Sequence, residues 1–117
     1  MKSNNILQIK SFAFAIRIVN VYKYLISEKK EYVLSKQLLK CGTSIGANVE
    51  EALGGQSEAD FYAKITIAYK ETRETGYWLR LMYETDYLKK EEFESLILDC
   101  DELARIIGKI QITIKNR

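Results

Sequence analysis

In this 117-residue chain, the residues that most resemble a catalytic or metal-binding pattern are closely spaced carboxylates. Glu71 and Glu74 lie three residues apart, and Glu50 and Glu51 are adjacent. Helical bundles house carboxylate metal sites, but those of the di-iron type take a Glu-x-x-His pair from each of two helices. The chain contains no histidine. We therefore favour a structural role for these carboxylates, expect no metal and no cofactor, and keep a carboxylate-bridged metal protein as an alternative.

Nucleophilic catalysis also lacks its usual partners. Neither Cys41 nor Cys100 can have a histidine as its base, and no serine follows a predicted strand as it does in a nucleophile elbow. Two distant cysteines do not make a disulfide framework, so we expect buried, reduced thiols in a cytoplasmic protein. The sequence predicts no catalytic residue and no enzyme.

Cations interleaved with an aromatic side chain suggest a different kind of site. A face of this composition attracts phosphates, although the net charge of the whole chain is only +2. The candidate nucleic-acid-binding residues are Lys70, Arg73, Tyr77 and Arg80 on one predicted helix, and Lys10 and Arg17 on another. A protein–protein adaptor without nucleic-acid binding therefore remains open.

Charge is distributed unevenly along the chain. Residues 1–27 contain four cations and no acid, whereas residues 84–104 contain eight acids and two lysines.

Polar residues also fall beside the predicted helix seam. We expect Asn48, Glu51 and Glu74 to pair there with cations, for which the candidates are Arg73, Arg80, Lys36 and Lys40.

Glycines Gly42 and Gly46 raise the question of a phosphate loop. Such a loop follows a strand and ends in Gly-Lys-Ser/Thr, and neither feature is present. With Ser44 and Ala47 they instead form a small-residue helix surface that a neighbouring backbone can approach closely. The later pair, Gly54-Gly55, predicts a helix end.

Hydrophobic periodicity predicts four helices, over residues 4–27, 36–53, 58–85 and 90–115. Ser35 is the candidate N-cap of the second helix, and Ser57 opens a capping box for the third. No proline interrupts these segments. Short connections make consecutive helices antiparallel, so residues 1–117 predict a single all-α domain, an up-down-up-down four-helix bundle.

The first predicted helix is apolar around well over half of its circumference. Lys10, Arg17 and Lys23 interrupt it, which disfavours a membrane span. A helix that packs on one side only has a narrower apolar face. We therefore expect this helix to be covered both by its own bundle and by a second copy of the chain.

Residues 35–82 carry a family resemblance. They resemble the four-helix bundle family encoded in intervening sequences of bacterial 23S ribosomal RNA genes, a fold similar to the accessory protein of diversity-generating retroelements. The matching residues are Gln37, Ser44-Ile45, Ala47-Asn48, Glu51-Ala52, Ser57, Phe61, Ala68, Glu74 and Tyr77-Trp78-Leu79. Leu39-Lys40-Cys41 stands where members often carry Arg-Arg-Ala, a departure that weakens any transfer of RNA binding.

The resemblance implies a bacterial, cytoplasmic protein without known catalytic activity that forms a homopentamer. Together with the residues, it predicts a non-enzymatic oligomeric scaffold that contacts RNA or a nucleoprotein partner. Neither a membrane nor a small-molecule substrate is expected as a partner.

Overall fold

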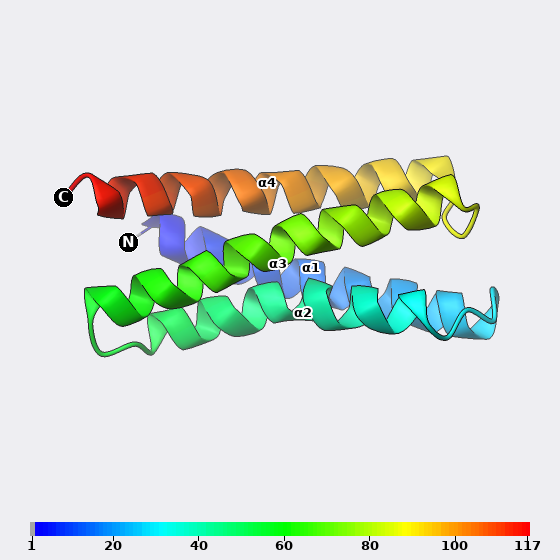
Figure 1. Cartoon of the computed structure of the whole chain (residues 1–117), viewed down its shortest axis with the longest axis horizontal. Helices are drawn as coiled ribbons and strands as arrows, with labels where there is room; N and C mark the ends of the chain where they lie inside the picture. Colours follow the sequence, from blue (N-terminus) through cyan, green and yellow to red (C-terminus); the bar gives the residue numbers. More distant parts are fainter. Residues whose placement is uncertain (1) are drawn as a thin grey trace.

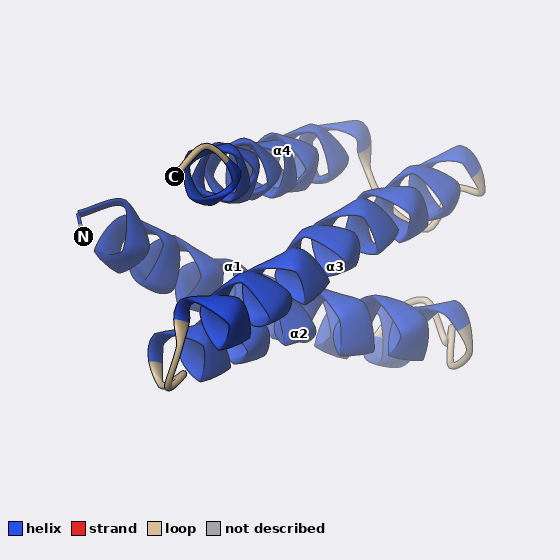
Figure 2. Cartoon of the chain, turned by 60° about the vertical axis from the view of Figure 1, so that its left-hand side comes forward, coloured by secondary structure: helices blue, strands red, loops and turns tan. Residues whose placement is uncertain are grey.

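Four antiparallel helices form the molecule (Figure 1). The computed structural model describes residues 2–117, with side chains from Ile6 onward. The helices are α1 (Lys2–Ser27), α2 (Leu34–Leu53), α3 (Glu58–Glu84) and α4 (Lys90–Lys115). Short loops connect them, and no strand occurs within residues 2–117 (Figure 2). Both termini lie at one end of a body of 47 × 21 × 19 Å, which confirms the predicted up-down-up-down bundle.

Each helix packs against two neighbours, in the cyclic order α1–α2–α3–α4. Their facing stripes form one apolar core whose largest fully buried side chains include Phe14, Ile18, Ile45, Leu79 and Ile107. The contact between α1 and α4 is the least extensive of the four. The bundle is therefore closed most weakly along this one seam.

Small residues bring α1 and α2 close together. A Cβ atom added at Gly42 would lie 2.8 Å from Cγ1 of the buried Ile18, and one at Gly46 would lie 3.3 Å from the backbone oxygen of Ser11. These distances are too short for ordinary packing. The glycines are thus helix-packing residues, as predicted, and α2 ends at Leu53, directly before Gly54-Gly55.

The two predicted helix starts have different outcomes. Ser57 caps α3, because its hydroxyl oxygen accepts the backbone N–H of Asp60 at 3.0 Å. The prediction of Ser35 as the cap of α2 is wrong. That helix begins at Leu34, and the buried carboxylate of Glu31 accepts the first N–H groups instead. Ser35 Oγ points back and donates to the carbonyl oxygen of Glu31.

The outer face of α1 is unusually apolar. Ile9, Phe12 and Ile16 follow one another at three- and four-residue spacing and are 69 %, 65 % and 51 % exposed. Nothing in the described chain covers them, so the prediction that a second copy does so stays a prediction. Within residues 2–117, none of the helices combines the length and hydrophobicity that crossing a membrane requires.

Candidate nucleic-acid interface

Four of the six candidate residues lie together on the solvent-facing side of α3. Lys70, Arg73, Tyr77 and Arg80 are spaced by three or four residues, and all four are exposed. None of the three cations forms an ion pair with a carboxylate among residues 6–117. Their charges are therefore available to a partner.

An aromatic pair lies within this face. The rings of Tyr77 and Trp78 meet edge to face, with centroids 5.1 Å apart and an interplanar angle of 79°. Trp78 Nε1 donates to Glu74 Oε2 at 3.1 Å, which holds the indole in place. Tyr77 is half exposed and presents a ring on which a nucleic-acid base can stack.

Gly76 is a buried residue of α3 that lies beside Arg80, and it was not among the predicted site residues. A Cβ atom at Gly76 would lie 3.3 Å from Arg80 Nη1. The glycine therefore leaves room for the guanidinium to fold back along α3. The glycine four residues before an arginine was the only sequence signal of this arrangement.

Lys10 and Arg17 are not part of the α3 face. Both lie on α1 and point to carboxylates of α4. Lys10 Nζ is 3.3 Å from Glu102 Oε1, and Arg17 Nη1 is 2.7 Å from Asp99 Oδ2. The structure thus separates three α3 cations that form no ion pair within residues 6–117, with Tyr77 among them, from two α1 cations that are paired with α4.

The polar residues beside the α2–α3 seam have other partners than predicted. Glu51 pairs with Lys64 at 2.8 Å, and Asn48 Nδ2 donates to the backbone oxygen of Ser44. Glu74 accepts from Trp78. Lys36, Lys40, Arg73 and Arg80 were the predicted partners, and those pairings are wrong. The sequence could not distinguish a same-helix partner from one across the seam.

The paired carboxylates do not converge on a metal-binding geometry. Burial raises the pKa of Glu71, and the neighbouring charge of Glu74 raises it further, while Lys40 opposes the change. Among the described residues, no group of three or more Asp, Glu, Cys or His side chains is arranged to hold a metal ion.

Both cysteines are buried free thiols. Burial raises the pKa of Cys41 to about 11 and that of Cys100 to about 12. Cys100 Sγ donates to the backbone oxygen of Thr72 at 3.3 Å. A thiol needs to ionise to act as a nucleophile, so both cysteines are unreactive at neutral pH.

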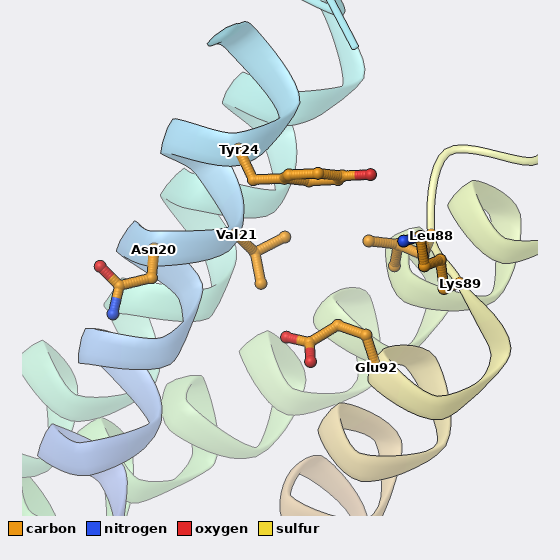
Figure 3. Close-up of a pocket in the computed structure, with 6 residues that line it drawn as sticks. All are labelled: Asn20, Val21, Tyr24, Leu88, Lys89 and Glu92. Atoms are coloured by element: carbon orange, nitrogen blue, oxygen red, sulfur yellow. The ribbon is translucent and has the colours of Figure 1, made fainter. Parts of the chain in front are cut away.

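A cavity of about 310 Å³ opens at the α1–α4 seam (Figure 3). The ring of Tyr24 extends across it, and the methyl groups of Val21 and Leu88 face each other. Glu92 directs its carboxylate toward α1. Asn20 and Lys89 also line the cavity, and its six lining residues include one carboxylate but no cysteine, serine or histidine. They do not form a nucleophile and base held by a third group.

Within residues 6–117, the geometry defines a four-helix bundle with exposed cations on α3 that form no ion pair, and it contains no recognisable reaction centre. Residues 3–109 match the model of the 23S rRNA-intervening sequence protein family, and the chain belongs to this family. No curated protein matches the chain.

One similar solved structure is a protein of unknown function from the S23 ribosomal protein family of Bacteroides thetaiotaomicron. It is 49 % identical, with a TM-score of 0.92, and the match covers 97 % of this chain and 98 % of that one. Neither the family nor this relative points to an enzymatic activity.

Proposed function

We propose that this protein is a non-catalytic, self-associating bundle that contacts RNA or a ribonucleoprotein through α3. The observation that carries the proposal is the exposed row Lys70, Arg73 and Arg80, whose charges no described carboxylate neutralises. Tyr77 lies within that row. Cations bind phosphates without regard to sequence, and an aromatic ring adds base stacking.

The name of one similar protein supports an RNA-related partner. The relative from Bacteroides thetaiotaomicron is assigned to a ribosomal protein family. We further propose a cytoplasmic location, which the two free cysteines support.

Filter binding of labelled single-stranded RNA at low and moderate salt tests the proposal. The variant K70Q/R73Q/R80Q removes the α3 charges, and K29Q/K36Q/K109Q removes three exposed lysines elsewhere as a matched control. Three phosphate contacts give a slope of log K against log[salt] of about −2 on single strands. The α3 variant should lose this slope and most of its binding, and the control should retain both.

No retention of RNA by the wild type, even at low salt, would remove RNA from the proposal. The protein would then be a protein–protein adaptor. Equal losses in the α3 and control variants would show that binding depends on total charge and not on this face.

Self-association is proposed through the exposed residues of α1. Among them, Phe12 lines a groove between α1 and α2 whose other lining residues include the small Ala15, Gly46 and Ala47. A ridge of large side chains beside a shallow groove fits the packing of one helix against another. A second copy of the chain supplies such a helix.

The assembly we propose is a ring of five copies. Leu98 and Ile112 are exposed apolar side chains on a different helix, α4. Contacts between two different surfaces are head to tail, and they form a ring when the rotation between copies closes. Light scattering should give five times the 13.6 kDa chain mass. Phe12→Glu should yield monomer, whereas Ile67→Glu on α3 should not. A monomeric wild type at micromolar concentration would contradict this proposal.

A further inference from the structure

The seam between α1 and α4 differs from the other three seams of the bundle. It has the least extensive helix contact, and three ion pairs cross it. Arg17 Nη1 lies 2.7 Å from Asp99, Arg17 Nη2 lies 3.7 Å from Glu92, and Lys10 Nζ lies 3.3 Å from Glu102. Charge complementarity thus connects helices that share relatively little apolar contact.

The two cations lie on one side of α1. Lys10 and Arg17 are seven residues apart, which is two turns, so both side chains face α4. The carboxylates of α4 occupy the positions that phosphate oxygens would take beside a lysine and an arginine. Each of the five side chains is between 30 % and 51 % exposed, so solvent and solutes reach all three pairs.

The end of the seam beyond Arg17 is incompletely packed. The cavity between Tyr24, Val21 and Leu88 lies there, and Glu92 belongs both to its lining and to the ion pairs (Figure 3). No apolar side chain fills this space. A small displacement of Glu92 away from Arg17 therefore disturbs little of the core.

We propose that the α1–α4 seam is a second, masked polyanion-binding site. Glu92, Asp99 and Glu102 hold Lys10 and Arg17 in the absence of a ligand, and RNA phosphates replace these carboxylates on binding. This inference rests on the proposed RNA contact, and it adds a way in which the number of cations available to RNA is regulated. α3 provides cations that are always available, and α1 provides two more when the α4 carboxylates release them.

The mask, which consists of the carboxylates of Glu92, Asp99 and Glu102, is held weakly enough for RNA phosphates to displace it. Exposed ion pairs contribute little to stability because water and salt screen them. A phosphate that replaces a carboxylate at Lys10 or Arg17 releases counterions from the RNA, which favours the exchange at low salt. Two added phosphate contacts increase the magnitude of the salt slope by about 1.4 on single-stranded RNA.

The variant E92Q/D99N/E102Q removes the mask and leaves Lys10 and Arg17 in place. The control E91Q/E94Q/D101N removes three exposed acids of α4 that form no ion pair among residues 6–117, and it changes the net charge equally. In filter binding, the unmasked variant should bind RNA about tenfold more tightly than the control, because RNA does not have to displace the carboxylates. The salt slopes of the two variants should be equal, since both make the same phosphate contacts once RNA is bound. Thermal melts followed by circular dichroism establish that both variants are folded.

Adding K10Q and R17Q to the unmasked variant should abolish its gain in affinity and reduce the magnitude of its salt slope by about 1.4. Hydrogen exchange provides a readout without RNA, and α1 amides should exchange faster in the unmasked variant than in the control. Equal affinities for the two triple variants, with wild-type binding that depends on α3, would overturn the mask and leave the proposed function standing.

Two other outcomes are distinguishable from that one. If the wild type fails to bind and the unmasked variant binds, the mask is supported and the α3 face is refuted. If no variant binds RNA at low salt, both proposals are overturned.

Discussion

Replacing Glu31 by glutamine tests how the loop between α1 and α2 is held. Glu31 Oε1 accepts the N–H groups of Leu34 at 2.9 Å and Val33 at 3.2 Å, and Oε2 accepts that of Ser35 at 2.7 Å. A glutamine oxygen can replace Oε1, but its NH₂ group would face the Ser35 N–H, which would lose its acceptor. Glu31 is 8 % exposed and Ser35 is fully buried, so water cannot compensate.

Glu31→Gln weakens a helix cap and leaves a buried N–H donor without an acceptor. We estimate that it lowers the free energy of unfolding by about 2 kcal/mol. For a domain of this size the melting temperature should fall by about 8 °C. Glu28→Gln is the matched control, because Glu28 is exposed in the same loop and its side chain forms no ion pair among residues 6–117.

The stability that the Glu31 carboxylate contributes should depend on pH, and its pKa shift determines the direction. Burial alone would raise the pKa of Glu31, but the N–H groups of Leu34, Ser35 and Val33 lower it below the ordinary value of 4.5. The carboxylate therefore contributes its full stabilisation above about pH 4.5, and this is lost as the pH falls through the lowered folded-state pKa. Melting curves should show the gap between wild type and Glu31→Gln narrowing in that range. A gap that is absent at pH 7, or that equals the effect of Glu28→Gln, would refute the reasoning.

Two further predictions concern packing and thiol chemistry. Gly42→Ala should destabilise the protein by about 1 kcal/mol, since a clash with Ile18 outweighs the gain in helix propensity. Gly108→Ala, whose Cβ would meet nothing closer than 4.0 Å, should stabilise it by up to about 1 kcal/mol. Denaturant titrations measure both changes in the free energy of unfolding, and changes of the same sign would contradict the packing argument. Cys41 and Cys100, whose pKa values are raised to about 11 and about 12, should react with a thiol reagent at pH 8 only after denaturation, and rapid labelling of the native protein would contradict their burial.

Much of the fold followed from the sequence because hydrophobic periodicity is a local property. The predicted helix over 90–115 coincides with α4, and the others differ by one or two residues at their ends. Ser57 could be identified as a cap because its side-chain oxygen accepts the N–H of Asp60, which is only three residues ahead in the sequence. Glu31 was missed because its carboxylate reaches N–H groups two, three and four residues ahead, from a position outside the usual capping pattern.

The candidate site was predictable only in part. Spacing placed Lys70, Arg73, Tyr77 and Arg80 on one helix face, and in the structure all four are exposed on α3, while their binding of nucleic acid stays a prediction. Which cations are paired depends on the tertiary arrangement. The acid-free segment 1–27 and the acid-rich segment 84–104 carried the signal for the α1–α4 pairs, but only once these segments were known to be neighbours.

Ultraviolet cross-linking of the wild-type protein to single-stranded RNA, followed by mass spectrometric identification of the modified residue, tests the central claim most directly. The account predicts a principal adduct on Tyr77 that disappears in K70Q/R73Q/R80Q and persists in K29Q/K36Q/K109Q. Adducts confined to other faces, or retained when the three α3 cations are removed, would contradict the account.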